Sequence, residues 1–189
     1  MSVLELMNTR RTYRRFEQKP VPQQVIDAIV QALRLSSCGR NAQAIRLLVI
    51  DRPEAVQQVN TLVKWAAALP PELGTPKPDQ RPTLFVAVVQ KNGAAESTDA
   101  GLAISNMVLA AWEQGVGSCI MQAIDRPALS ELFALPADEY LHSVIAFGYP
   151  THQSRVVEVP ADGSLKYYLD ENNDYCVPKL PTEALWNRF

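Results

Sequence analysis

Three short apolar runs constrain the fold of this chain more than any other feature. They cover residues 45–50, 84–89 and 143–148, and their apolar side chains follow one another almost without interruption. Such runs are typical of strands that are covered on both faces. We therefore expect three interior strands, and the 189 residues are enough for one compact domain with a sizeable core.

Apolar residues recur at helical spacing in the segments before and between these runs. The sequence predicts a short helix that ends near Asn8, helices over residues 23–35 and from residue 53, a long helix over about 97–115, and a short helix capped by Asp125. Residues 115–119 are expected to form a glycine-punctuated turn that lacks the spacing of a nucleotide-binding glycine motif.

The composition excludes several classes of protein. Hydrophobic residues make up 47% and charged residues 20%, as in ordinary globular proteins, and no apolar run approaches a membrane span. A net charge of -2 does not suit a nucleic-acid binder, which needs a broad basic face. His142 and His152 lack the spacing of metal ligands, so we expect no metal site. The three cysteines, Cys38, Cys119 and Cys176, form no disulfide framework, and no signal peptide is evident, so we expect a cytoplasmic protein.

Residues 10–16 concentrate positive charge in one place. Four arginines, Arg10, Arg11, Arg14 and Arg15, stand with a threonine and two aromatic residues in this segment. Guanidinium groups match the geometry of phosphate and make charge-assisted hydrogen bonds to it. Most runs of basic residues, however, only solvate a surface. An anion-binding clamp and a solvated basic turn therefore both remain open from this segment alone.

A small, polar, helix-breaking segment over residues 36–43 stands directly before the first apolar run. Gly39 permits unusual backbone dihedrals, and the Ser, Asn and Gln side chains offer both donors and acceptors. The segment is either a plain helix-to-strand loop or a loop that hydrogen-bonds a flat polar heterocycle.

Two other segments stand apart by composition. Residues 70–82 contain five of the 14 prolines and predict an ordered surface loop, which is either a lid over a pocket or a passive connector. Residues 151–189 show little regular patterning but carry aromatic residues such as Tyr167, Tyr168 and Trp186. Because so much apolar surface does not stay in water, we expect this tail to pack on its own chain or on a partner subunit.

Five segments, in order along nearly the whole chain, resemble those of the nitroreductase family of FMN-dependent oxidoreductases. Residues 10–16 resemble its Arg-Arg-Ser-x-Arg-x-Phe opening, and residues 37–43 its Pro-Ser-x-Gly-Asn-x-Gln loop. Residues 113–119 resemble its Glu-x-Gly-Leu-Gly-Thr-Cys segment, residues 146–150 its Leu-Gly-Tyr-Pro strand end, and residues 177–179 its Val-Pro-Lys segment. Any one of these similarities is weak evidence, whereas five in the same order are strong evidence.

The resemblance implies an α+β fold, with a central mixed β-sheet flanked by helices in a single FMN-binding domain over residues 1–189. It also implies an intertwined homodimer with the flavin at the subunit interface. The C-terminal extension, residues 151–189, would then pack on the partner subunit. The other partner would be a small-molecule electron acceptor.

The resemblance further implies which residues hold the flavin. Arg10 would pair with the FMN phosphate, together with Lys179 from the tail, while Arg11 and Thr12 would add backbone or hydroxyl contacts. Arg14 would lie toward the pyrimidine end of the ring. Seven other positions would contact the ring or shape its surroundings: Ser37, Cys38, Gly39, Asn41, Gln43 and the backbone of Gln122 and Ala123, which would donate to flavin N5.

The chain also departs from the family pattern. Ala44 and Ile45 replace a Pro-Trp pair, Arg40 replaces a glycine, and Leu180 replaces an arginine. These departures bear on the choice of substrate more than on flavin binding.

The function implied by the resemblance is an FMN-dependent oxidoreductase that takes hydride from NAD(P)H. It would then reduce an electron-poor acceptor, a nitroaromatic or a quinone, by a ping-pong mechanism, and no side chain need act as general acid or base. Two alternatives stay open: a specialised flavin enzyme for dehalogenation, enone reduction or oxygen-dependent chemistry, and a non-catalytic FMN-binding protein. The sequence does not distinguish NADH from NADPH.

Overall fold

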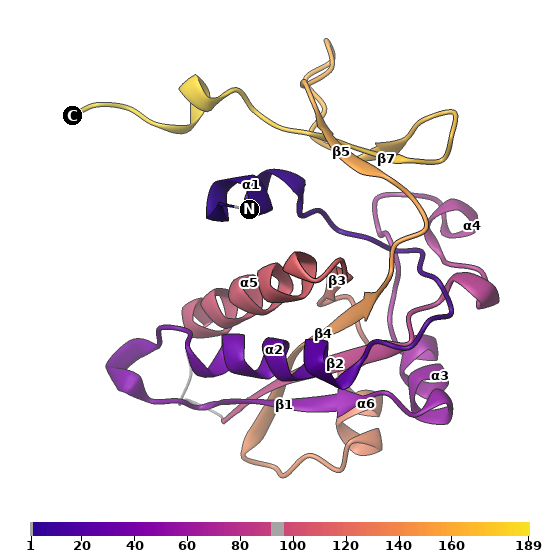
Figure 1. The fold of residues 1–189 in the computed structure, drawn as a ribbon, viewed down its shortest axis with the longest axis vertical. Coiled ribbons are helices and arrows are strands. Elements are labelled where there is room, and N and C mark those ends of the chain that lie inside the picture. The colour runs from indigo at the N-terminus through magenta and orange to yellow at the C-terminus, as the bar shows by residue number, and fades with distance from the viewer. Residues whose placement is uncertain (1, 92–96) are drawn as a thin grey trace.

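A computed structural model describes residues 2–91 and 97–189 (Figure 1). The helices are α1 (Val3–Thr9), α2 (Gln23–Arg34), α3 (Pro53–Thr61), α4 (Pro71–Gly74), α5 (Ser97–Glu113) and α6 (Arg126–Leu132). The strands are β1 (Ile45–Ile50), β2 (Leu84–Lys91), β3 (Gly117–Met121), β4 (Glu139–Gly148), β5 (Ser154–Val157), β6 (Tyr168–Leu169) and β7 (Tyr175–Pro178). Three short 3-10 helices are η1 (Gly39–Asn41), η2 (Pro78–Gln80) and η3 (Thr182–Leu185).

The central sheet has the strand order β1-β2-β4-β3, and all its pairings are antiparallel. The three predicted strands are confirmed as β1, β2 and β4, and the α+β class is confirmed with them. Only β2 and β4 are interior; β1 is an edge strand with several part-exposed or exposed positions, so the expectation of an interior strand was wrong there. The sheet was expected to be mixed, but its four strands pair antiparallel; parallel pairing joins β5 to β7 and occurs as an isolated bridge between Thr12 and Ser118 of β3. The connection over residues 51–83 is long enough for β2 to run in either direction beside β1, so the sequence pattern does not fix this choice.

β3 forms where the sequence predicted a turn. Gly117 begins this strand because only a residue without Cβ fits there: an added Cβ would lie 2.7 Å from both Pro150 Cγ and Tyr13 Cδ2. The glycine therefore serves close packing at this position rather than chain reversal. The reversal itself lies at Gly115, whose φ of 76° is in the left-handed region.

Helices cover both faces of the central sheet, which explains its nearly continuous apolar strands. Along β2, Leu84, Val86 and Val88 pack with residues of α2 and α5. The alternate residues Phe85, Ala87 and Val89 pack with residues of α3 and α6. Side chains of a strand alternate between its faces, so a strand that is covered on both sides must be apolar at every position.

The predicted helices are confirmed within a few residues at their ends, and Asp125 caps α6 by accepting from the N–H of Ala128 at 3.2 Å. One feature of α1 was not expected. Its apolar face is exposed, since Val3 and Leu4 are each 68% and Met7 48% accessible.

The proline-rich segment is ordered by contacts at both of its ends. It contains α4 and η2, and the Gln80 carbonyl accepts from the N–H of Phe16 at 2.9 Å. Near its start, the N–H of Ala68 donates to the hydroxyl of Tyr167 at 3.3 Å. The segment thus lies against both the arginine segment, residues 10–16, and the C-terminal extension.

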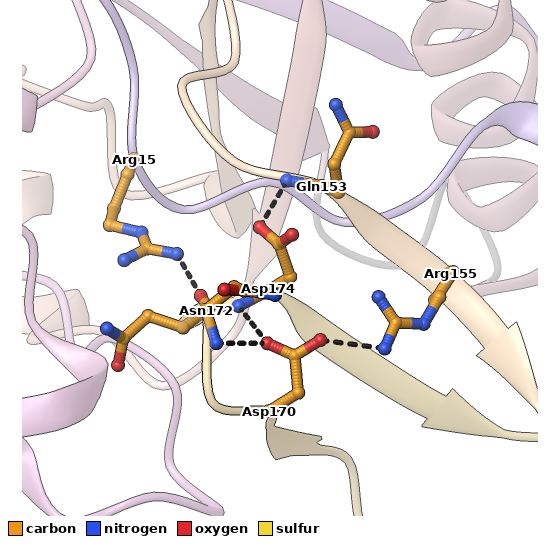
Figure 2. Close-up of polar contacts among 7 residues, drawn as sticks. Arg15, Gln153, Arg155, Asp170, Asn172 and Asp174 are labelled. Atoms are coloured by element: carbon orange, nitrogen blue, oxygen red, sulfur yellow. Dashed lines mark hydrogen bonds and ion pairs between the residues drawn. The ribbon is translucent and has the colours of Figure 1, made fainter.

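Most of the C-terminal extension packs on its own chain as a small sheet with the order β5-β7-β6. Figure 2 shows the turn that joins β6 to β7, where Asp170 accepts from the N–H groups of Asn172 and Asp174 and pairs with Arg155 at 2.7 Å. Arg15 donates to a carbonyl of the same turn, that of Asn173.

The last residues leave the body of the molecule, as the yellow end of the ribbon shows in Figure 1. Leu185 is 66% and Trp186 58% accessible. Of the two expectations for the tail, packing on its own chain therefore holds up to β7 and fails for residues 180–189. In residues 2–91 and 97–189, no helix is long and apolar enough to span a bilayer.

Candidate functional site

The arginine segment runs as an extended strap beside β3. Thr12 bridges Ser118 in parallel, the N–H of Tyr13 donates to the Ser118 carbonyl at 2.9 Å, and Phe16 bridges Pro150. Tyr13 and Phe16 are buried in the core. The two aromatic residues therefore fix the strap, with Arg14 and Arg15 between them and Arg10 and Arg11 before them.

The four arginines do not act as one clamp. Arg11 donates to the carbonyls of Met7 and Asn8 at 3.0 and 2.7 Å, so its side chain caps the end of α1. Arg15 is bonded to the turn after β6. Arg14 lies 4.4 Å from the ring centroid of Tyr167 and 4.7 Å from that of Tyr175. Arg10 lines a cavity, and the other three arginines line none of the five main cavities in the described part of the chain.

Arg14 and Arg15 attach the C-terminal extension to the strap. Guanidinium groups stack favourably on aromatic faces, and such contacts gain strength when they are shielded from water. Stacking uses the faces of the Arg14 guanidinium and leaves its N–H donors in the plane; its Nε is buried without a partner. The predicted role of Arg14 toward a flavin is compatible with this position and stays a prediction.

Arg10 borders a cavity of about 360 Å³ beside α5 and the end of β3. Its apolar lining consists of Ile104, Val108 and Ile120, and its polar lining includes Gln122. The N–H groups of Gln122 and Ala123 make no hydrogen bond within the described residues, so both donors are available. We call this cavity the Arg10 pocket; its remaining lining residues are Gly101, Ser105 and His142.

The charge of Arg10 has no counterion in the described structure, where the ion pairs are Arg46–Glu139 and Arg155–Asp170. Burial lowers the pKa of Arg10, and the neighbouring Arg11 lowers it further. Both effects mean that the charged form lacks the solvation or the partner that it needs. A half-buried, unpaired guanidinium at the rim of a cavity favours binding of an anion there.

The polar loop at residues 37–43 forms a second cavity. The cavity has a volume of about 250 Å³, and its lining includes four of the predicted residues, Ser37, Cys38, Asn41 and Gln43. Gly39 does not line it, but its N–H donates to Asp99 Oδ1 at 3.0 Å and so holds the loop against α5. Sequence reasoning missed Asp99, which also lines the cavity.

This loop carries backbone strain. Arg40 and Asn41 each have a φ of 53°, and Gln43 has a φ of 49°, all in the left-handed region. Such conformations destabilise the fold by about 1–3 kcal/mol each for residues other than glycine, and they gather at functional sites. A plain connecting loop has no reason to retain three of them, so the strain favours the ligand-binding explanation of the two that the sequence left open.

The two cavities share no lining residue. One chain therefore does not bring Arg10, Gln122 and the polar loop together. Lys179 lies apart from both cavities, exposed after β7, where its N–H donates to the Val157 carbonyl at 3.1 Å. The proline-rich segment lines neither cavity; Pro78, Arg81 and Pro82 border another, of about 470 Å³.

A second residue of the Arg10 pocket, His142, was considered from the sequence only as a metal ligand. The signal that could have found it is a break in alternation, because His142 and Ser143 are successive polar residues directly before the apolar run at residues 144–147. A β-bulge is one structure that places two successive side chains on the same face of a strand.

Comparison with known proteins finds one family model that matches the chain, the Nitroreductase family, over residues 7–149. A protein of Methanothermobacter thermautotrophicus, provisionally named NADH dehydrogenase/NAD(P)H nitroreductase, is 25% identical over 157 residues, which are 79% of this chain and 78% of the relative. A provisional NAD(P)H nitroreductase of Bacillus subtilis is 22% identical over 80% of this chain and 86% of its own.

Solved structures share the fold. A nitroreductase family protein from Clostridium difficile 630 superimposes with a TM-score of 0.68 at 19% identity, over 80% of this chain and 86% of that one. An FMN-dependent nitroreductase from Clostridium difficile R20291 gives a TM-score of 0.67 at 18% identity, over 81% and 90%. At these identities the likeness establishes the fold alone.

Proposed function

Because the chain belongs to the nitroreductase family, we propose that it is an FMN-dependent oxidoreductase that takes hydride from NAD(P)H and reduces an electron-poor small molecule, a nitroaromatic or a quinone. The observation that carries the proposal is the unpaired, half-buried charge of Arg10 at the rim of a cavity whose lining includes Ile104, Val108 and Ile120. The names of relatives, which refer to FMN and to NAD(P)H, support the choice of cofactor and reductant.

The residues of the Arg10 pocket fit FMN, which joins a phosphate to a flat ring with polar edges. The guanidinium of Arg10 suits the phosphate, and Ile104, Val108 and Ile120 suit the face of a ring. The N–H groups of Gln122 and Ala123, which have no partner in residues 2–91 and 97–189, suit an acceptor atom at the ring edge.

FMN, when bound, supplies the redox chemistry by exchanging hydride and electrons with the two substrates in turn. The chain supplies binding, orientation and charge. Arg10 would offset the phosphate charge, and Ile104, Val108 and Ile120 would pack on the ring. Arg14 does not line this pocket, so its proposed role toward the ring would need the guanidinium to be reached from outside it. No side chain needs to act as general acid or base, and the two substrates would use one pocket in turn, which is a ping-pong scheme.

The complete site is proposed to need two copies of the chain. The polar loop lies in a different cavity from Arg10, so a second copy would have to present its loop at the Arg10 pocket of the first. The exposed apolar faces support such a homodimer: Leu185 and Trp186 in the tail, and Val3 and Leu4 on α1. Residues 180–189 would then cover the partner, and Lys179 would reach the phosphate.

A mixing experiment tests the composite site. Arg10→Gln and Asn41→Ala would each damage both sites of a homodimer. In a mixed dimer, one site would contain both substitutions, and the second site would contain neither. We therefore expect FMN binding to recover on mixing and exchanging the two purified variants, to about half of the sites in each mixed dimer. The same treatment of either variant alone is the control. A site that lies within one chain would show no recovery.

Two further features belong to the proposal. The three cysteines are unpaired in the described structure, which supports a reducing cytoplasm as its location.

Initial rates of NADH and NADPH oxidation, measured at several concentrations of a quinone and of a nitroaromatic, would give parallel double-reciprocal lines for a ping-pong enzyme. Intersecting lines would contradict that scheme.

A further inference from the structure

We propose that His142 is a second anion-binding residue of the Arg10 pocket, which takes up a proton when an anionic group binds beside Arg10. The inference rests on the proposed function, since it concerns the same pocket and the anionic parts of FMN. His142, on β4, would thus give the anion a contact that depends on protonation, in addition to the contact from Arg10 on the strap.

A β-bulge places His142 in the pocket. Val88 of β2 pairs with Ser143, and the next residue, Val89, pairs with Leu141, so His142 is the extra residue of β4. Leu141 and Val144 both pack in the core cluster on the α3 side of the sheet. Because of the extra residue, neither His142 nor Ser143 points to the α3 side of the sheet, although they are successive residues. His142 lines the cavity together with Ile104 and Ser105 of α5. Bulges re-aim side chains in this way next to binding sites.

The imidazole has few partners of its own. Its Nδ1 lies 3.2 Å from the hydroxyl of Ser143, a contact whose direction depends on the tautomer. Its other nitrogen makes no hydrogen bond within the residues that the structure describes. A histidine that was only filling the core would be expected to be closed off, whereas this ring is half-buried and borders a cavity.

Two positive charges lie near His142, and the carboxylate on its own strand, Glu139, is paired with Arg46. Arg10 of the strap lines the same pocket. Arg126 of α6 donates to the Leu141 carbonyl at 2.8 Å and to the His142 carbonyl at 3.5 Å. The lining contributed by α5 and β3 holds no titratable side chain. Burial lowers the pKa of His142, and the charge of Arg126 lowers it further, so both effects favour the neutral ring.

An anion in the pocket reverses this balance. Its charge stabilises the imidazolium, and by linkage the protonated ring binds the anion more tightly than the neutral ring does. Each unit by which the anion raises the pKa of His142 corresponds to about tenfold tighter binding at a pH at which the ring is protonated. The phosphate and the ring of FMN are both possible sources of the negative charge.

Nuclear magnetic resonance of the imidazole groups tests the proposal directly, because the chain has only two histidines. The C–H resonances of His142 and His152 are assigned with His142→Gln and followed from pH 4.5 to 8.5, with and without saturating FMN. Riboflavin, which lacks the phosphate, provides a second arm. We expect FMN to raise the pKa of His142. His152, whose pKa lies at about 4, should stay neutral through most of this range with and without FMN. A shift with FMN alone assigns the effect to the phosphate, and a shift with both ligands assigns it to the ring.

The pH dependence of FMN affinity provides the second readout. The phosphate of FMN itself titrates near pH 6, at about the pKa of other phosphate monoesters. The informative quantity is therefore the ratio of the dissociation constants of His142→Gln and the wild type. We expect this ratio to rise as the pH falls from 8 to 5.5, toward a limit of about tenfold for each unit of pKa shift that is reached only below the pKa of His142 in the free protein. The control variant Tyr140→Phe, on the same strand and able to keep the ring contact with Arg126, should follow the wild type.

The outcomes separate this inference from the proposed function. FMN binding with an unchanged pKa of His142 and a constant ratio would overturn the inference and leave the proposed function intact. Failure of the wild type to bind FMN would overturn both. Binding with the expected shift and a rising ratio would support both.

Discussion

Replacing Arg10 with glutamine removes the unpaired charge at the rim of the Arg10 pocket while keeping a polar side chain of moderate length. Arg10 has no carboxylate partner in the described structure, and its side chain makes no hydrogen bond there. The substitution should therefore leave the free energy of unfolding within about 0.5 kcal/mol of the wild type. Its effect should appear when the phosphate binds.

The size of that effect follows from the bond that is lost. A hydrogen bond to a charged group contributes about 1.5–3 kcal/mol, and about 1.4 kcal/mol corresponds to a tenfold change in affinity. We expect Arg10→Gln to weaken FMN binding about 10- to 150-fold. Riboflavin lacks the phosphate, so its affinity should change less than threefold, about 0.6 kcal/mol.

Titration of flavin fluorescence measures both affinities in one buffer. Arg52→Gln is the matched control, because it removes the same charge from an exposed position at the start of α3. If Arg10→Gln bound FMN as tightly as the wild type, the assignment of Arg10 to the phosphate would be wrong. If it weakened riboflavin and FMN equally, Arg10 would act on the ring or on the shape of the pocket instead.

Three other outcomes are expected. Asp99→Ala removes the acceptor of the Gly39 N–H and should weaken FMN binding about 3- to 10-fold in the same titration, whereas Asp99→Asn should retain most of the affinity. Gly117→Ala forces a Cβ to 2.7 Å from Tyr13 and should lower the free energy of unfolding in urea by about 1–3 kcal/mol; an unchanged midpoint would show that the strap gives way freely. Burial, Arg15 and Arg14 lower the pKa of His152 to about 4, so the unfolded chain binds a proton there more readily than the folded chain. The neutral state of His152 therefore supports the folded chain fully above about pH 6.5, and the free energy of unfolding falls by about 3 kcal/mol as the pH falls toward 4. Urea unfolding of His152→Phe should lack that part of the pH dependence.

Much of the fold could be predicted because it depends on local patterns. The alternation of buried faces along β2 and the cap at Asp125 depend on neighbouring residues in the sequence. β3 was missed because Gly117 serves a contact with Tyr13 and Pro150, and such a contact is visible only once the chain has folded. The antiparallel order of the sheet depends on long connections that the pattern does not direct.

The site was less predictable for the same reason. Four residues of the polar loop were expected and do share a cavity, since they are neighbours in the sequence. The partners of Arg14 and Arg15, however, lie about 150 residues further along the chain, so their stacking and hydrogen bonding could not be foreseen. His142 enters the pocket through a bulge that shifts the register of one strand pair. The separation of Arg10 from the polar loop depends on tertiary structure alone.

The visible absorption spectrum of the purified protein, recorded before and after anaerobic addition of NADH or NADPH, tests the central claim most directly. We expect a flavin spectrum, present on isolation or after addition of FMN, that bleaches with at least one of the two nicotinamides. A flavin that stays oxidised with both would favour a flavin-binding protein without this activity. A colourless protein that takes up no FMN would contradict the proposed function and leave Arg10 as a solvated surface charge.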